Sequence, residues 1–269
     1  MILSSNKLAF SQHYLFTMNK DNLGDRMKEF YENRAKVKLI RRMPVIIRID
    51  GKAFHTFTKG FEKPFDSVMV KAMQDTMKYL CENIQGCVLG YTQSDEITLV
   101  LVDYNKLDTD AWFDYDVQKL CSVSASMATF AFNRSFAKIA MLNSKDRIKY
   151  TNAYSESSYK GAMFDSRCFN VPVEEVTNCI LWRQQDATRN SIQAVGQANF
   201  SHKELQRLST NQIQELLFSK CGINWNDFPT HLKRGCCCIK KEDGWYIDEE
   251  IPIFKGEDRN YIEKLINYE

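Results

Sequence analysis

Residues 45–51 read VIIRIDG, a short run of β-branched apolar residues that is typical of a buried strand. The run ends at Asp50 and Gly51, so we expect the Asp50 carboxylate at the C-terminal tip of this strand. Residues 65–83 follow with apolar side chains at helical spacing, which predicts a helix that is broken at Gln85-Gly86. The chain therefore begins its core as strand and then helix.

Two more strands are predicted directly after this helix. Residues 87–91 and 97–102 are apolar and flank a tight turn, residues 93–96, which reads QSDE. A crossover helix makes the first two strands parallel, so their C-terminal ends share one edge of the sheet. Asp50 and the turn with Asp95 and Glu96 are therefore expected at the same edge.

The converging acids have two interpretations at this point. Mg²⁺ binds one or two carboxylates together with phosphate oxygens, and a pair of such ions supports in-line displacement at phosphorus. Judged by spacing alone, however, an acid at a strand end is more often a turn residue. For Glu96 the choice is between tuning or holding a metal and simply opening a strand at the surface.

The remaining pattern predicts an α+β fold. Residues 116–137 are expected to form a second helix and residues 162–169 a fourth strand, which completes a βαββαβ core of ferredoxin-like type over residues 44–171. Residues 1–43 are an N-terminal segment with an amphipathic helix over 22–41. Residues 172–269 are a C-terminal part packed on the core as one unit. It contains a long helix over 173–198, helices over 203–208, 212–220 and 261–266, and a hairpin of residues 235–241 and 245–254.

Composition restricts the class of protein. A hydrophobic content of 44% supports a substantial core, and a net charge of +2 does not by itself indicate a nucleic-acid partner. No apolar run approaches the ~20 residues of a membrane span, and the first 17 residues do not resemble a signal peptide. The nine cysteines have no zinc-type spacing, so we expect reduced thiols in a cytoplasmic protein.

A basic run interleaved with tyrosines lies between the second helix and the fourth strand. Basic and aromatic residues together suit RNA backbone and stacking contacts. A solvated helix end and loop explains the same pattern equally well. The basic residues are Arg134, Lys138, Lys145, Arg147, Lys149 and Lys160.

Several ordered motifs resemble those of the tRNA-histidine guanylyltransferase family, whose members are reverse-direction (3′–5′) nucleotide polymerases. The matching strings are RIDGKAFHTF (48–57), GFEKPFD (60–66), GYTQSDE (90–96), FDSR (164–167), WRQQDATRN (182–190), FSKCGINWND (218–227) and LKRG (232–235). The resemblance runs from about Met18 to about Lys241. Ordered motifs of this kind are far more specific than any one of them.

The resemblance implies a polymerase/cyclase-type palm with two Mg²⁺ ions. Asp50 and Asp95 would be the catalytic metal ligands, joined by the Gly51 carbonyl. The family pattern places the following residues on the nucleotide, which would be ATP, GTP or another nucleoside triphosphate: Asp50, Gly51, Lys52, Ala53, Phe54, His55, Lys63, Asp66, Ser94, Asp95 and Arg167. The family often has Asn at position 65, where this chain has Phe.

The resemblance also implies a function at the 5′ end of tRNA. The 5′-phosphate is adenylylated by ATP, and the 3′-hydroxyl of an incoming nucleotide then displaces AMP. Contacts to tRNA are expected from Arg189, Asn190, Lys145, Arg147 and Lys149, and the protein is expected to be a homotetramer. Arg48 has two interpretations, a buried pairing role or a phosphate contact.

One departure from the family pattern bears on the substrate. Eukaryotic members continue the W-R-Q-x-D-x motif with HINNLYN, whereas this chain has TRNSIQA over residues 188–194. Thr188 replaces the histidine, as in bacterial-type members, which resemble repair polymerases. The predicted function is therefore template-dependent repair of tRNA 5′ ends. The alternatives are a dedicated guanylyltransferase that adds one G to histidine tRNA, a nucleotidyl cyclase, or a non-catalytic tRNA-binding protein on a palm fold.

Overall fold

The computed structural model describes residues 22–143 and 148–267. The predicted tRNA contacts Lys145 and Arg147 lie outside these residues. The chain divides into two compact units, Met1–Lys38 and Leu39–Glu269. In the first unit, α2 (Asn22–Phe30) is followed by the 3₁₀ turn η1 (Glu32–Ala35). The helix expected over 22–41 is therefore too long, because the backbone tightens into a 3₁₀ turn directly after it.

The second unit is built on one six-stranded sheet. Its order is β4-β1-β3-β2-β5-β6, and every neighbouring pair is antiparallel. Because β1 and β2 both run antiparallel to β3, they are parallel to each other, and their C-terminal ends share an edge as predicted. The strands are β1 (Val45–Gly51), β2 (Cys87–Gln93), β3 (Glu96–Leu101), β4 (Phe164–Asn170), β5 (Cys236–Lys241) and β6 (Gly244–Asp248).

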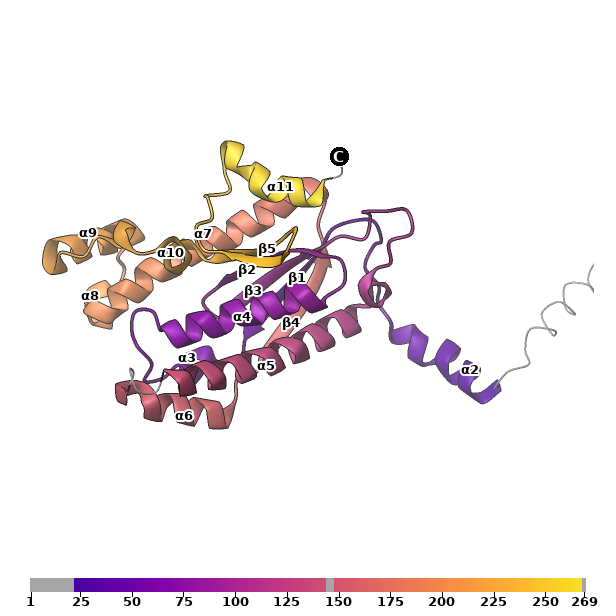
Figure 1. The fold of residues 1–269 in the computed structure, drawn as a ribbon, viewed down its shortest axis with the longest axis horizontal. Helices are drawn as coiled ribbons and strands as arrows, with labels where there is room; N and C mark the ends of the chain where they lie inside the picture. Colours follow the sequence, from indigo (N-terminus) through magenta and orange to yellow (C-terminus); the bar gives the residue numbers. More distant parts are fainter. Residues whose placement is uncertain (1–21, 144–147, 268–269) are drawn as a thin grey trace, which may run out of the picture. The chain divides into compact units, whose positions relative to one another are not determined.

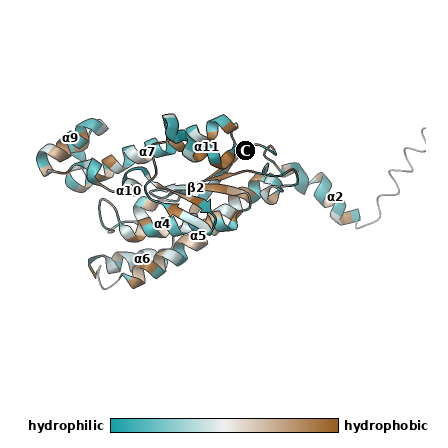
Figure 2. Ribbon diagram, turned by 45° about the horizontal axis from the view of Figure 1, so that its top comes forward, coloured by the Kyte–Doolittle hydropathy of each residue, from teal (hydrophilic) through white to brown (hydrophobic). Residues whose placement is uncertain are grey.

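Helices cover both faces of this sheet (Figure 1). On one face α4 (Ser67–Asn83) and α5 (Val117–Leu142) bury Ile47 and Ile49 of β1. On the other face α7 (Val173–Asn199) and α11 (Asn260–Ile266) bury Ile46. In Figure 2 these helices carry both hydrophobic and hydrophilic residues, as expected for elements with one face on a core. The predicted α+β class and the order βαββαβ are confirmed.

The start of α4 differs from the prediction for a clear physical reason. Asp66 is the N-cap, and its carboxylate accepts hydrogen bonds from the backbone N–H groups of Val68 and Met69, both at 3.0 Å. A capping residue has non-helical backbone angles, so the helix begins at Ser67 rather than Phe65. The apolar positions that predicted this helix, from Val68 to Leu80, are buried.

Short helices are the elements that periodicity misses. Phe54 and Phe57 of α3 (Phe54–Phe57) are buried and pack on Phe132 of α5, with ring centroids 5.4 and 5.6 Å away. Periodicity did not predict this helix, because packing rather than intrinsic propensity stabilises so short a segment. The other missed helices are α6 (Thr151–Lys160) and α10 (Thr230–Arg234), and the missed 3₁₀ turns are η2 (Trp112–Tyr115), η3 (Ile148–Tyr150), η4 (Trp225–Asp227) and η5 (Gly256–Arg259).

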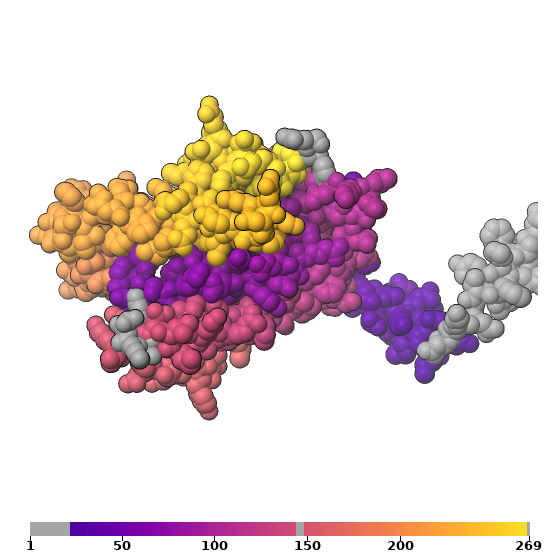
Figure 3. Space-filling model, in the orientation of Figure 1, coloured from indigo at the N-terminus to yellow at the C-terminus, as the bar shows by residue number. Residues whose placement is uncertain are grey.

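The C-terminal part joins the same sheet. The predicted hairpin is present, but β6 ends at Asp248 rather than Phe254, because the Asp248 carboxylate accepts a hydrogen bond from the Glu250 N–H and the chain turns away. Phe254 is buried, and its N–H donates to the Gln184 side chain. In the space-filling view this part (orange to yellow) lies directly on α4, with α5 and α6 on the other side (Figure 3).

The far end of α7 carries a separate small core. Its buried residues come from α7, from α9 (Thr210–Cys221) and from Trp225 of η4, and α8 (His202–Leu205) lies beside it. Both short helices begin with a capping box, Ser201 with Glu204 and Ser209 with Gln212. None of the helices in residues 22–143 and 148–267 is long and apolar enough to cross a membrane.

Candidate active site

Two carboxylates meet at one edge of the sheet. Asp50 lies opposite Glu96 in the pairing of β1 with β3, and Asp95 is in the turn just before Glu96. The Gly51 N–H donates a 3.0 Å hydrogen bond to the Asp95 carbonyl, which fixes the two segments side by side. The convergence predicted from strand order is therefore present in the structure.

The surroundings of the two carboxylates suit a bound cation. Burial raises the pKa of Asp95, the hydrogen bond from the Ser94 hydroxyl (3.0 Å) opposes this, and the negative charge of Asp50 raises the pKa further. Within the described part of the chain, no side chain donates a hydrogen bond or forms an ion pair with the Asp50 carboxylate. Because neither acid forms a direct ion pair with a described cationic side chain, a bound metal ion would supply the balancing positive charge.

The donor set fits Mg²⁺ better than a metal held entirely by protein. Across residues 22–143 and 148–267 there is no group of three or more His, Cys, Asp or Glu side chains that would hold a metal. An ion at Asp50 and Asp95 would thus complete its shell with backbone, water or phosphate oxygens. Mg²⁺ binds in this way in many phosphoryl-transfer sites.

A cavity of about 600 Å³ opens beside the two carboxylates; we call it the active-site cavity. All nucleotide-binding residues predicted from the sequence line it except Lys52 and Arg167. The lining residues from the prediction are Asp50, Gly51, Ala53, Phe54, His55, Lys63, Asp66, Ser94 and Asp95.

Backbone geometry explains the residues at the mouth of this cavity. A Cβ atom at Gly51 would lie 2.2 Å from the Phe54 ring, so only glycine fits there. Ala53 (φ 53°) and Ser94 (φ 50°) adopt the left-handed conformation, which is strained for residues other than glycine. Such strain is commonly found at ligand sites, where the surrounding packing maintains it.

Lys63 is the one Lys or Arg among the described residues that line the active-site cavity. Its side chain is exposed, and it has no hydrogen bond or ion pair within the described residues. Because Lys63 forms no ion pair with a described carboxylate, its charge is available to neutralise a polyphosphate bound in the cavity.

Asp66 has a different arrangement from the one that the family pattern implied. Its carboxylate is buried and accepts four hydrogen bonds, from the N–H groups of Glu62, Val68 and Met69 and from the Tyr154 hydroxyl at 2.7 Å. With its oxygens so occupied, Asp66 fixes the start of α4 and the loop that carries Lys63. Its contribution to the cavity wall is therefore structural.

Lys52 and Arg167 lie outside the active-site cavity. Arg167 is on β4, opposite Arg48 of β1, and donates to Asp165 at 2.8 Å. The hydrogen bond to Asp165 raises the pKa of Arg167 above its ordinary value. Arg48 lies over the Trp182 ring, 5.3 Å from its centroid, and within the described residues it has no carboxylate in hydrogen-bond contact.

Glu96 is neither a surface residue nor free to hold a metal. Its carboxylate is held by both arms of the Arg183 guanidinium, at 2.6 and 2.7 Å, and both side chains are less than a tenth exposed. Burial alone would lower the pKa of Arg183, but the bonds to Glu96 and to Asp186 raise it. This ion pair joins α7 to the edge of the sheet that carries Asp50 and Asp95, and it was not predicted from the sequence.

The predicted tRNA contacts on α7 lie in different surroundings. Arg189 is exposed and pairs with Asp186 at 2.6 Å, whereas Asn190 lines a second, smaller cavity. The Thr188 hydroxyl donates back to the Gln184 carbonyl at 3.0 Å. In the basic run, Lys149 is exposed and lies over the Tyr150 ring.

Comparison with known proteins agrees with this geometry. The tRNA(His) guanylyltransferase family model matches residues 24–172. A bacterial tRNA(His) guanylyltransferase-like protein in complex with ATP is 45% identical, with a TM-score of 0.80 over 91% of this chain and 99% of that one. A second structure, a bacterial tRNA(His) guanylyltransferase-like protein in complex with GTP, is 42% identical, with a TM-score of 0.75 over 92% of this chain and 100% of that one.

The tRNA(His) guanylyltransferase of Saccharomyces cerevisiae is 29% identical over 221 residues, which cover 76% of this chain and 85% of that protein. The region matched by the family model contains both carboxylates, β1 to β4 and all residues that line the active-site cavity except Ala194 and Gln197. The chain belongs to the tRNA(His) guanylyltransferase family of nucleotidyltransferases.

Proposed function

We propose that this protein adds nucleotides to the 5′ end of tRNA in the 3′–5′ direction, with the opposite strand as template. The observation that carries the proposal is the pair Asp50 and Asp95, placed without a cationic partner from the described residues beside a cavity of about 600 Å³. That arrangement suits a metal-assisted reaction at a nucleoside triphosphate. ATP and GTP are the proposed substrates, because related proteins were solved with each.

The proposed reaction has two displacements at phosphorus. An oxygen of the tRNA 5′-phosphate attacks the α-phosphorus of ATP, and the bond to pyrophosphate breaks. The 3′-hydroxyl of the incoming nucleotide then attacks the adenylylated 5′-phosphorus, loses its proton, and releases AMP. A 5′-triphosphate end skips the first displacement.

Each residue has a proposed part in this chemistry. Asp50, Asp95 and the Gly51 carbonyl would hold two Mg²⁺ ions on a palm of polymerase/cyclase type. When bound, Mg²⁺ lowers the cost of forming the attacking alkoxide and stabilises charge on the phosphoryl group. Lys63 holds the triphosphate, and the strained backbone at Ala53 and Ser94 shapes the cavity around it. We assign no side chain as an essential general base.

Proposed contacts to tRNA extend beyond the active-site cavity. Arg189, Asn190 and Lys149 would contact the RNA. Arg189 and Lys149 would bind phosphate groups, and such contacts do not read the base sequence. We further propose a cytoplasmic homotetramer, since one core unit is too small to hold both ends of a tRNA.

Repair of several tRNAs is favoured over addition of one G to histidine tRNA. At Thr188, where eukaryotic members have histidine, the hydroxyl is already bonded to the helix backbone. It therefore offers no free donor to a base, and no titratable ring is present. This position supports a contact surface that tolerates different RNA sequences.

Transfer of label tests the proposed class directly. Incubation with Mg²⁺, 5′-monophosphate tRNA and α-labelled ATP is expected to give tRNA with a labelled 5′-adenylate. A nucleotidyl cyclase would instead convert ATP to a cyclic nucleotide without RNA, and a non-catalytic tRNA-binding protein would release neither product. Either of these results would overturn the proposal.

Lys63→Ala is expected to weaken nucleotide use. Loss of a charged hydrogen bond costs about 1.5–3 kcal/mol, or roughly 10- to 150-fold in nucleotide KM. The affinity for tRNA should change much less. Steady-state kinetics over a range of nucleotide concentrations measures the effect.

The matched control for this variant is Lys59→Ala. Lys59 is an exposed lysine of the same loop that does not line the active-site cavity. An unchanged nucleotide KM in Lys63→Ala, or an equal rise in both variants, would contradict the assignment.

A further inference from the structure

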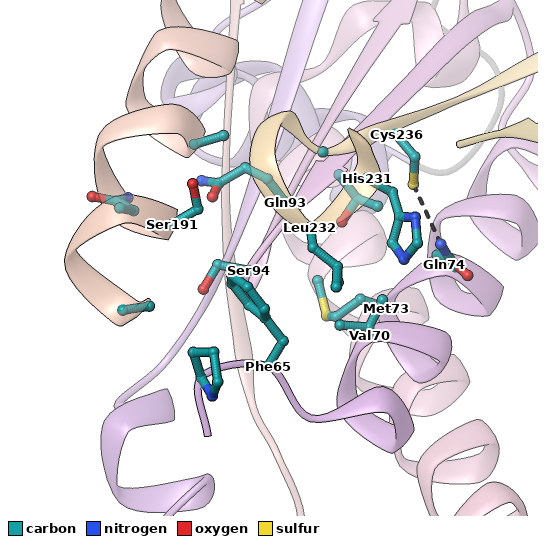
Figure 4. A pocket seen from close by; sticks show the side chains of 16 residues that line it. Phe65, Val70, Met73, Gln74, Gln93, Ser94, Ser191, His231, Leu232 and Cys236 are labelled. Carbon is teal, nitrogen blue, oxygen red and sulfur yellow. Dashed lines mark hydrogen bonds between the residues drawn. The ribbon is translucent and has the colours of Figure 1, made fainter. Parts of the chain in front are cut away.

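A second cavity of about 150 Å³ lies behind the active-site cavity, between β2, α4, α7 and α10 (Figure 4). Phe65 and Ser94 line both cavities, so the second one begins beside the turn that carries Asp95. We call it the second cavity. Ser94 and Asn190, which line it, have proposed roles above, but the cavity itself has not been assigned a ligand.

The lining of the second cavity excludes a phosphate and suits an uncharged ring. Among the described residues, no Lys, Arg, Asp or Glu lines it. Its apolar side includes Phe65, Met73 and Leu232, which surround the space in Figure 4. An apolar cavity of roughly 150 Å³ is large enough for a benzene-sized ring.

Polar groups on the opposite side are available to recognise the edge of such a ring. Within the described residues, the side-chain amides of Gln93 and Asn190 have no hydrogen-bond partner. The His231 Nδ1 atom is buried without a hydrogen bond and lies 3.6 Å from a Glu249 oxygen. By contrast, the Ser191 hydroxyl is fully engaged, donating to the Lys233 carbonyl and accepting from the Trp225 indole N–H.

Phe65 is held as a fixed wall of this cavity. Its ring packs edge-on against Phe228, with centroids 5.6 Å apart, and is half-buried. A fixed aromatic ring beside unpaired amides is the combination with which proteins bind nucleobases, by stacking on the face and hydrogen bonding on the edge.

We propose that the second cavity binds a nucleobase, stacked on Phe65 with its edge facing Gln93 and Asn190. The inference rests on the proposed function, which requires two nucleotides and an RNA end at one pair of carboxylates. The active-site cavity would hold one triphosphate, since Lys63 is the one lysine among the described residues that line it. The base in the second cavity belongs either to a second free nucleotide or to the terminal nucleotide of the RNA.

Equilibrium binding separates these sources and needs no catalysis. The probes are ATP with Mg²⁺, inorganic tripolyphosphate, and tRNA with or without one unpaired 5′ nucleotide. The variants are Phe65→Leu and Asn190→Ala, and the control is Gln193→Ala, an exposed α7 residue that does not line the second cavity. Loss of base stacking is expected to weaken binding in Phe65→Leu by roughly 5- to 150-fold.

Weaker ATP binding with unchanged tripolyphosphate binding would identify a free nucleotide as the source. Weaker binding of only the tRNA with the unpaired nucleotide would identify the RNA end. Unchanged affinity for ATP and both tRNAs in both variants, or an equal loss for tripolyphosphate, would overturn the proposal. Asn190→Ala keeps the test valid if Phe65→Leu does not fold, because Asn190 is exposed. A protein without transferase activity would still give these results, so failure here is distinct from failure of the proposed function.

Discussion

Asp95→Asn is expected to abolish both 5′-adenylylation and nucleotide addition while the protein stays folded. The amide has the same shape, but it removes one of two negative charges that would hold Mg²⁺ against phosphate. Loss of one group that stabilises transition-state charge costs about 10²–10³-fold in rate, and loss of a metal ligand costs at least as much. Asp50→Asn should have the same effect, and single-turnover assays of both steps measure it.

The control for these variants lies on the same edge of the sheet. Asp165→Asn changes an exposed acid that is directly opposite Asp50 on β4 but does not line the active-site cavity. It should keep most of the activity. Full activity in purified Asp50→Asn or Asp95→Asn would contradict the assignment of these residues as metal ligands, whatever the activity of Asp165→Asn.

Arg183→Met is expected to destabilise the fold by about 3–5 kcal/mol, because it leaves the Glu96 carboxylate buried without a partner. The buried pair joins α7 to the start of β3, one residue from Asp95. The double variant Arg183→Met/Glu96→Gln should recover most of this loss, since no buried charge remains. Urea unfolding of the three proteins measures the free energy of unfolding.

Arg189→Met provides the comparison for this effect. Arg189 is in the same helix and pairs with Asp186, but its side chain is 52% exposed, and such surface pairs contribute about 0–1 kcal/mol. An Arg183→Met protein no less stable than Arg189→Met would mean that the buried pair does not hold α7 in place.

Local patterns were sufficient to predict the elements that place the proposed metal ligands. The apolar run of residues 45–49 and the helical spacing from Val68 to Leu80 determined β1, α4 and their connection. Chain order then placed Asp50 and Asp95 at one edge. No long-range information was needed, because a helical crossover fixes the relative direction of two strands.

The parts that were wrong depend on partners far away in sequence. Glu96 was treated as a ligand or a surface residue, because nothing in its neighbourhood indicates Arg183. An acid that opens a fully apolar strand, together with an arginine in a separate motif, is the pattern that would have suggested the pair. The hydrogen bonds of Asp66 were also not predicted, since the Tyr154 hydroxyl that binds it comes from α6, a helix that periodicity did not predict. The contact of Asp66 with a nucleotide stays a prediction.

The second cavity also could not be predicted from the sequence. Its walls combine residues of five elements, β2, α4, α7, α10 and β5. From the sequence, Phe65 indicated the loss of a polar contact rather than the gain of an aromatic surface. Packing on Phe228 and against the small core at the far end of α7 gives the Phe65 ring a defined position.

The nucleotide added to a shortened tRNA tests the central claim most directly. The tRNA lacks its first 5′ nucleotide, the facing base of the acceptor stem is changed to each of the four bases in turn, and all four nucleoside triphosphates are present. Template-dependent addition predicts that the added base follows Watson–Crick pairing with the changed base, in tRNAs of several identities. Addition of G whatever the facing base, or activity on histidine tRNA alone, would contradict the account and indicate a dedicated guanylyltransferase.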